Sequence, residues 1–381
     1  MFKFVFGLWW LLGGLTAALA LAAAPAEAPS HEPIPFPIWF SEPVAPTGYA
    51  HALALDSADR PHLLFQDPDT RLLRYAAGGE SGWEYDDIAV IPSLHPDLTF
   101  DLAVAANDAP CLAYANAPPV IIDPIDTKLV YGCRGEDGWD LSAIDDGGRT
   151  VTLVLDGDTP HIALVQGLAA VYLTRVDGVW QREVVGQDAA YMGRTWLYLD
   201  GAARPHLIFV GSEGAFEGVR EPNGLWAVAP FPMHSLLALT LDAADRPWLL
   251  LTEAEAQWGH PPFSFNRLLL ATPDGSGGWA TEMLREDYDW SIAADLAVAG
   301  NDDVHVAYRD VGGALRYRWR AGGAPWQTES PIDQLDADLH LALGSDGQPR
   351  ASFGRGGQLW LATRRIVLLD RGLYLPSITA P

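Results

Sequence analysis

The sequence predicts an all-β protein, a seven-bladed β-propeller with four-stranded blades, and three observations predict it. First, the stretch LDSADRPHLLF, which starts at residue 55, returns as LDGAARPHLIF at 199 and as LDAADRPWLLL at 241. Second, the proline of this stretch marks a repeat of 42 to 57 residues, a period typical of propeller blades. Third, short apolar segments lie between turn-forming clusters such as SADRP and GDTP, which favours strands over helices.

Most repeats contain four strand-like segments in the same order. The first ends before the Asp- and Gly-rich turn, and the second begins at the repeated proline, where the missing N–H costs no ladder bond. The second is apolar on successive residues, as expected of a strand covered on both faces. A third segment follows in most copies, and the fourth begins at a tryptophan. The prolines are Pro61, Pro110, Pro160, Pro205, Pro247 and Pro349, with Val304 in the remaining copy, and the tryptophans are Trp83, Trp139, Trp180, Trp226, Trp279 and Trp326.

These segments define the blades and the closure of the ring. The last repeat lacks a Trp-led fourth strand, whereas PIWFSEPVA at 37–45 resembles the fourth strands of other repeats. We therefore expect 37–45 to complete the last blade, which removes two exposed sheet edges. RIVLLD at 365–370 is the alternative fourth strand, and 366–381 is expected to form a tail on the outside. The blades are expected at about 51–90, 99–145, 150–186, 192–232, 234–286, 290–333 and 336–365 plus 37–45.

The N-terminus has the pattern of a secretory signal peptide. Lys3 precedes an apolar run over 4–23, and small-residue A-x-A sites follow at 22–24 and 26–28. We expect residues 1–28 to be removed, 29–36 to be a linker, and the mature protein to be extracellular with no membrane span. The apolar run is long enough to span a bilayer if it is retained, so a membrane tether remains the alternative.

The charge restricts the partners. The net charge is −25, and Lys128 is the only lysine beyond the signal segment. Such a surface disfavours nucleic acid and anionic lipid. Solubility outside the cell and cation binding are the two explanations of the acidity. We expect a monomer whose partner is a carbohydrate or a protein at the cell surface.

The repeat resembles a known superfamily. The pattern L-D-x-x-x-x-P-H-L-x-F, followed by L-x-Y-A and G-W, resembles the repeats of secreted bacterial propellers of the sialidase-like, Asp-box (BNR) superfamily over about residues 37–365. TPDGSGGW at 272–279 and RVDGVW at 175–180 are similar to its Asp-box turn. The resemblance implies a propeller and, as one alternative, glycoside hydrolysis. The F/Y-R-I-P motif of sialidases is absent from the sequence, so no catalytic residue is predicted.

The two cysteines occupy matching places in the second repeat. Cys111 follows the repeated proline, and Cys133 lies on the third strand, where the first repeat has Ala77. These places should face each other across an antiparallel pair, so a disulfide is predicted in an oxidising compartment. Two buried thiols are the alternative.

Four histidines share one place in the repeat. They follow the proline or its substitute, where adjacent blades hold them about 10 Å or more apart. That distance is too large for ligands of one zinc ion, so we interpret them as structural. They are His62, His161, His206 and His305.

Longer segments between the second and third strands share a face with the connections between blades. They are 115–128, 210–223 and 252–267. Aromatic rings beside polar groups on this face suit a sugar or a peptide, and folding of the loops on themselves is the alternative. The candidate ligand-binding residues here are Tyr191, Trp258, His260, Phe263, Phe265, Tyr288 and Trp290.

A second candidate set lies at the start of the innermost strands. Charged groups there would face the central channel and bind a small ligand, or Ca²⁺ between the two aspartates, with solvation by channel water as the alternative. No other cofactor is predicted. These residues are Asp101, Asp295, His340, Arg149 and Arg194.

The sequence thus leads to one functional hypothesis with two alternatives. The hypothesis is a secreted, non-catalytic propeller that binds a carbohydrate or peptide on the face with the long loops. The alternatives are a sialidase-like glycoside hydrolase and a structural module of the cell surface.

Overall fold

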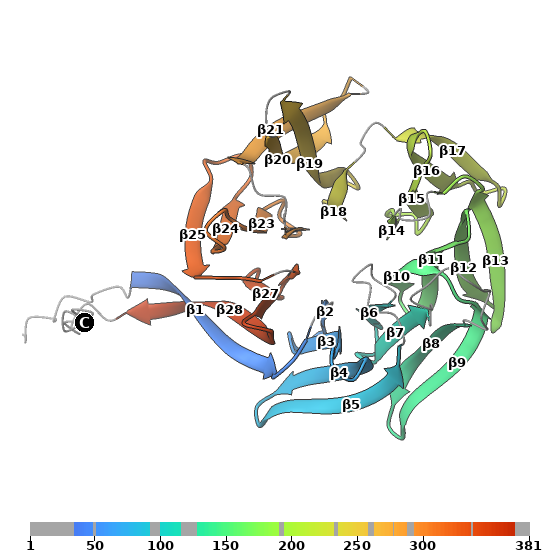
Figure 1. The fold of residues 1–381 in the computed structure, drawn as a ribbon, viewed down its shortest axis with the longest axis horizontal. Coiled ribbons are helices and arrows are strands. Elements are labelled where there is room, and N and C mark those ends of the chain that lie inside the picture. Colours follow the sequence, from blue (N-terminus) through green and yellow to red (C-terminus); the bar gives the residue numbers. More distant parts are fainter. Residues whose placement is uncertain are drawn as a thin grey trace, which may run out of the picture. The chain divides into compact units, whose positions relative to one another are not determined.

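A computed structural model describes residues 34–48, 51–91, 100–115, 128–189, 194–231, 235–257, 263–276, 278–287, 293–336 and 338–369. The chain divides into two compact units. The larger, residues 38–365, is a ring of seven four-stranded antiparallel sheets (Figure 1). In the smaller, the described residues are 34–37 and 366–369. Within the described ranges, no helix is long and apolar enough to cross a membrane.

Six blades are built from four consecutive strands each, paired in chain order from the axis outward. Blades one to three comprise β2 (His51–Leu55), β3 (Pro61–Gln66), β4 (Leu72–Gly79), β5 (Gly82–Val90); β6 (Phe100–Val104), β7 (Pro110–Ala115), β8 (Lys128–Gly135), β9 (Gly138–Asp146); and β10 (Arg149–Asp156), β11 (Thr159–Gln166), β12 (Ala169–Val176), β13 (Val179–Gly186). Blades four to six comprise β14 (Thr195–Leu199), β15 (Pro205–Gly211), β16 (Gly214–Arg220), β17 (Trp226–Phe231); β18 (Leu236–Leu241), β19 (Pro247–Gln257), β20 (Phe263–Pro273), β21 (Trp279–Asp287); and β22 (Ala294–Val298), β23 (Val304–Arg309), β24 (Leu315–Arg320), β25 (Gln327–Ile332).

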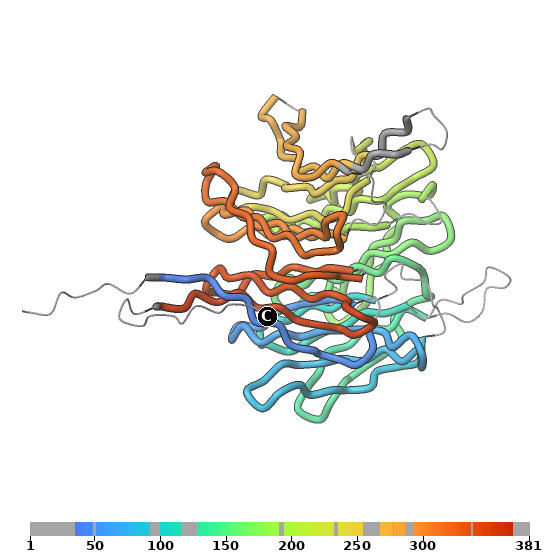
Figure 2. The backbone as a smooth tube through the Cα atoms, turned by 60° about the vertical axis from the view of Figure 1, so that its left-hand side comes forward, coloured from blue at the N-terminus to red at the C-terminus, as the bar shows by residue number. Residues whose placement is uncertain are grey.

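The seventh blade combines both ends of the chain. Its strands are β26 (Leu339–Leu343), β27 (Pro349–Arg355), β28 (Gln358–Leu369) and β1 (Ile34–Ala45), in that order from the axis. In Figures 1 and 2, the blue β1 lies beside the red β28. The predicted fold and its closure by the N-terminal strand are therefore confirmed. Residues 365–369 of the alternative fourth strand, RIVLLD, are instead the end of β28, and Asp370 lies outside the described residues.

The repeated LD…RP stretch forms the turn between the first and second strands of a blade. Asp56 Oδ1 accepts the N–H groups of Ala58 and Arg60, and Oδ2 accepts Arg60 Nε at 2.6 Å. Asp200 and Asp242 make the same three contacts in blades four and five. The repeated residues therefore serve the turn of each blade rather than a repeated chemical step.

Neighbouring blades are joined by a contact that we name the inter-blade latch. In it, a carboxylate on the outermost strand of one blade accepts hydrogen bonds from an Arg and a Trp indole of the next. Glu183 thus accepts Arg220 at 2.8 Å and Trp226 Nε1 at 2.6 Å. The other latches are Asp86 with Arg134 and Trp139, Glu282 with Arg320 and Trp326, and Glu329 with Arg364 and Trp39.

The last of these latches closes the ring. Glu329 belongs to β25, Arg364 to β28 and Trp39 to β1, so one carboxylate binds both ends of the chain. Burial alone would raise the pKa of Glu329, but the hydrogen bonds from Arg364 and Trp39 lower it below its usual range. Trp39 also packs edge-to-face on Tyr317, with ring centroids 5.2 Å apart. The equivalent pairs between other blades are Tyr75–Trp139, Tyr131–Trp180 and Tyr172–Trp226.

Two of the three expected long loops are largely strands, which corrects the interpretation of 210–223 and 252–267. In blade four, β15 turns directly into β16, and Gly211 pairs with Gly214. The β16 pattern was hidden because Glu217 occupies a partly buried position, where it accepts the Tyr198 hydroxyl at 2.5 Å. In blade five, β19 and β20 pair out to Gln257 and Phe263. Of the third loop, 116–127 lies outside the described residues.

The closing latch is expected to stabilise the ring more than a latch between consecutive blades. In Glu329→Gln we expect a loss of about 2 kcal/mol in the free energy of unfolding, since the Arg364 charge is buried and loses its partner. The matched control is Glu282→Gln, whose carboxylate is 40% exposed, with an expected loss of about 1 kcal/mol. Urea unfolding followed by tryptophan fluorescence measures both. An equal or smaller loss in Glu329→Gln would contradict the special role of this latch.

Candidate functional site

A cavity of about 410 Å³ lies on the axis of the ring, and we name it the axial cavity. Each blade contributes residues from the start of its innermost strand or from just before it. Because successive strands alternate in direction, the starts of all seven innermost strands lie on one face. The ends of the outermost strands β5, β9, β13, β17, β21 and β25 lie on the same face, as do Gln257 and Phe263 at the far end of the β19–β20 pair. The cavity therefore opens where the long segments were expected to converge.

One side of the axial cavity is polar. Blades six, seven and one supply Asp295, Asp338, His340 and His51 to its lining. His340 Nδ1 lies 3.9 Å from Asp295 Oδ2. The rings of His51 and His340 meet edge-to-face, with centroids 4.8 Å apart. Two imidazoles and two carboxyl groups thus share one wall.

The opposite side is largely apolar. Blades four and five supply Trp196, Leu236, Leu237 and Leu239. Arg194, just before β14, is the cationic residue of the described lining. An aromatic and leucine wall facing hydrogen-bonding groups is the arrangement expected for a small ligand with an apolar body and polar edges.

Asp101 and Asp295 occupy the same place in blades two and six, opposite Ala113 and Ala307. In each, Oδ1 accepts the N–H of the following residue. Oδ2 accepts an N–H from the next blade, Leu153 at 2.8 Å for Asp101 and Leu341 at 2.7 Å for Asp295. Burial raises the pKa of Asp101 to about 6 and that of Asp295 to about 7, against the lowering effect of these backbone bonds. These carboxyl groups therefore join blades and titrate near neutral pH.

The other titratable groups differ from this pair. Burial lowers the pKa of His340 to about 3, so its imidazole is neutral at physiological pH. Burial raises the pKa of Asp338, although the nearby charges of His51 and Arg194 lower it. Asp338 precedes β26 as Arg194 precedes β14, with a left-handed backbone (φ 51°). Within the described part of the chain, no hydrogen bond or ion pair engages the side chains of Asp338 and Arg194.

The structure brings four of the channel residues together. Asp101, Asp295, His340 and Arg194 line the axial cavity, whereas Arg149 begins β10 opposite Val165 and is not part of the lining. Ligand binding by these residues stays a prediction.

The aromatic candidates fall largely outside the description. Phe263 and Phe265 lie on β20 opposite Gln257 and Glu255, and their side chains are not among the described ones. The candidates wholly outside the described residues are Tyr191, Trp258, His260, Tyr288 and Trp290.

Three lining residues were missed by the sequence analysis. His51 stands where other blades have Phe100, Thr195 or Leu339, so the repeat does not mark it. Asp338 and Trp196 are also single occurrences at their places. Comparison of the residues just before and at the start of each innermost strand would have been the signal.

The second-strand histidines have structural partners. The Nδ1 atoms of His161 and His305 lie 2.6 and 2.5 Å from the hydroxyls of Tyr172 and Tyr317. His62 pairs in the same way with Tyr75. Burial lowers the pKa of all three histidines. Among the residues that the structure describes, no group of three or more His, Cys, Asp or Glu side chains could hold a metal ion.

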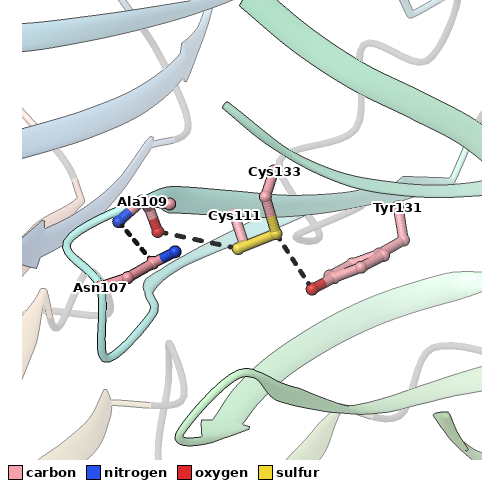
Figure 3. Close-up of a disulfide and its surroundings, with 5 residues drawn as sticks. All are labelled: Asn107, Ala109, Cys111, Tyr131 and Cys133. Carbon is pink, nitrogen blue, oxygen red and sulfur yellow. Dashed lines mark hydrogen bonds between the residues drawn. A yellow bond between two sulfur atoms is a disulfide. The ribbon is translucent and has the colours of Figure 1, made fainter. Parts of the chain in front are cut away.

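The predicted disulfide between Cys111 and Cys133 is present, joining directly opposed residues of β7 and β8 (Figure 3). The Tyr131 hydroxyl donates a hydrogen bond to Cys133 Sγ at 3.2 Å. The bridge closes a loop of 22 residues and contributes roughly 3 kcal/mol in the chain-entropy model. It joins the start of β7 to the last part of β8, at the end of this strand pair that is distant from the segment 116–127.

Comparison with known proteins supports the fold. No protein-family model and no curated protein matches the chain. A streptogramin B lyase structure matches with a TM-score of 0.54 and 13% identity, over 86% of this chain and 98% of the other. The catalytically inactive histidine-to-alanine variant of virginiamycin B lyase from Staphylococcus aureus, with quinupristin, matches with 0.54 and 10%, over 85% and 99%. The polysaccharide lyase Uly1 matches with 0.52 and 10%, over 87% and 92%. At these identities the similarity shows a shared fold, and the protein belongs to the β-propeller class.

The titration of Asp295 should be visible in the stability of the protein. Because its pKa is raised from 3.8 to about 7, the folded protein keeps a proton that the unfolded chain releases. This contribution is present at low pH and is lost as pH rises from about 4 to about 7. The free energy of unfolding of Asp295→Asn relative to wild type should therefore improve by about 2–4 kcal/mol over that range. Urea titrations at several pH values measure the slope, and a slope equal to wild type would refute the buried titration.

Proposed function

We propose that this protein is a secreted, non-catalytic β-propeller that binds a carbohydrate or peptide ligand in the axial cavity. The single observation that carries the proposal is the two-sided lining of that cavity. Secretion is supported by the signal-like residues 1–28 and by the disulfide, a bond that persists in oxidising compartments.

The dimensions and chemistry of the cavity support a small ligand. A volume of about 410 Å³ falls in the range of small-molecule pockets. A sugar ring presents an apolar C–H face that suits Trp196 and the leucine wall, and hydroxyl edges that suit Asp338, His340 and Arg194. A short peptide segment offers a similar division into apolar side chain and polar backbone.

Carbohydrate and peptide arrays test the proposal. We expect the mature protein to bind a defined subset of ligands and His340→Ala or Trp196→Ala to lose at least tenfold in affinity, because each removes a contact from one wall. Asp69→Asn, in an exposed turn of blade one, serves as the control and should bind like wild type. Binding that survives both cavity substitutions would place the ligand elsewhere, and no binding on either array would refute the function.

Glycoside hydrolysis is the second candidate, and one observation favours it. Asp295 has a pKa of about 7 and lies 3.9 Å from a neutral imidazole, so it can hold a proton at neutral pH as a general acid must. The resemblance of the repeats to the sialidase-like superfamily agrees with this candidate. The resemblance does not identify the partner carboxylate that glycoside hydrolysis requires.

Turnover of fluorogenic glycosides distinguishes the two functions. A hydrolase should lose at least 100-fold in kcat in Asp295→Asn, since the proton donor is gone. Asp101→Asn is the matched control, because Asp101 makes the same backbone contacts without a neighbouring histidine. Equal losses in both variants, or no turnover in wild type, would exclude this catalytic role of Asp295.

A further inference from the structure

We propose that the ligand of the axial cavity carries a cationic amine, which binds on the wall formed by Asp295 and Asp338. The inference rests on the proposed function and adds the charge class of the ligand.

The balance of charged groups in the cavity is the first argument. Three carboxyl groups line it, from Asp101, Asp295 and Asp338, against one guanidinium, Arg194. Arg194 belongs to blade four, whereas Asp295 and Asp338 belong to blades six and seven. The polar wall thus holds two carboxyl groups and no Lys or Arg among its described lining residues.

The rest of this protein shows what a shielded carboxylate normally receives. Nearly inaccessible Asp56 and Asp242 accept Arg60 and Arg246, with N–O distances of 2.6 and 2.7 Å. Glu329 accepts Arg364 at 2.8 Å. Further pairs of this kind are Asp86–Arg134, Glu183–Arg220, Asp200–Arg204, Glu282–Arg320 and Asp310–Arg316.

The cavity carboxyl groups depart from this rule. Asp295 has two backbone N–H donors and His340 at 3.9 Å, which is neutral, but no guanidinium. Asp338 has no hydrogen bond to the described residues, and the nearby charges of His51 and Arg194 only partly offset the effect of its burial on its pKa. A carboxylate removed from water without a directly paired cation is unfavourable, and burial accordingly raises the pKa of both groups. An ammonium group on the ligand would supply the missing positive charge.

The form of the cavity indicates an organic cation. Ca²⁺ takes six to eight oxygen ligands, and no three His, Cys, Asp or Glu side chains in the described part of the chain are placed to hold a metal ion together. The facing wall of Trp196 and leucines instead suits an apolar or ring-shaped body that bears the amine. The net charge of −25 also raises the local concentration of cations.

Cation binding should be linked to protons. The groups that face Asp295 in the cavity are His340, His51, Asp338, Asp101 and, from blade four, Arg194. An ammonium group favours the ionised carboxylates, so binding should release protons and strengthen as pH rises from 5 to 8, as long as the amine stays charged.

Probes that share a ring and differ at one substituent, which sets their charge, test the inference. The probes are glucosamine, glucose, N-acetylglucosamine and glucuronic acid, together with cyclohexylamine and cyclohexanol. Titration calorimetry and ligand-observed NMR at low salt compare wild type, Asp338→Asn and the control Asp69→Asn. We expect at least one amine to bind tenfold or more tightly than its neutral partner, to weaken tenfold in Asp338→Asn, and to be unaffected in Asp69→Asn.

The outcomes separate this inference from the function on which it rests. If glucose or glucuronic acid binds more tightly than glucosamine, and this binding is lost in His340→Ala, the inference of a cationic amine is refuted and the cavity remains the ligand site. Amine binding that is unchanged in Asp338→Asn, or displaced by Ca²⁺ alone, would also overturn it. Failure of both amines while an array ligand binds in the cavity refutes the inference only. Failure of every probe and both arrays refutes the inference and the function together.

Discussion

The hydrogen bonds that Glu329 accepts from Arg364 and Trp39 are the contact on which the ring depends. A propeller closes only if its last blade is complete, and here that blade needs strands from both chain ends. The same combination of carboxylate, guanidinium and indole joins other blades, so closure uses no special chemistry. What differs is that the other latches join consecutive blades of the chain, whereas this one also holds the N-terminal strand, 290 residues away.

At the axis of the ring, in contrast to the latches, carboxyl groups lack arginine partners. Asp101 and Asp295 stitch neighbouring innermost strands through backbone N–H groups, but their charge has no arginine partner. Asp338 adds a third carboxyl group in a left-handed backbone position that a non-glycine residue adopts at some cost. Unfavourable features of this kind persist where the fold over-determines them and are common at binding sites. The centre therefore depends on the stability that the outer strands provide.

The architecture was predictable because its determinants repeat. The proline, the turn aspartate and the tryptophan return in nearly every blade, so the repeats can be aligned and the place of a residue in one blade predicts its place in the others. This comparison predicted the positions of Trp39 and of the Cys111–Cys133 pair. The strand β16 was not predicted because Glu217 interrupts its apolar pattern. The partners of Glu217, Tyr198 and His206, are visible only in three dimensions. His51 and Asp338 were not predicted as site residues because no other blade carries the same residue at the same place. A site formed by convergence of seven different blades leaves no periodic trace.

The mixed composition of the seventh blade also sets the order in which the molecule can be completed. Among the strands of the ring, β1 is synthesised first and its partner β28 last. β1 must therefore stay without its partner until all the other strands have been made, and the loop that closes then runs from Ala45 to Gln358. Loop closure entropy grows only slowly with length, so the delay adds little to the equilibrium cost, but such distant pairing makes the final step slow. Until β1 pairs, the outer edge of β28 is open to strands of other chains, so a high local concentration of newly made chains favours intermolecular exchange of β1.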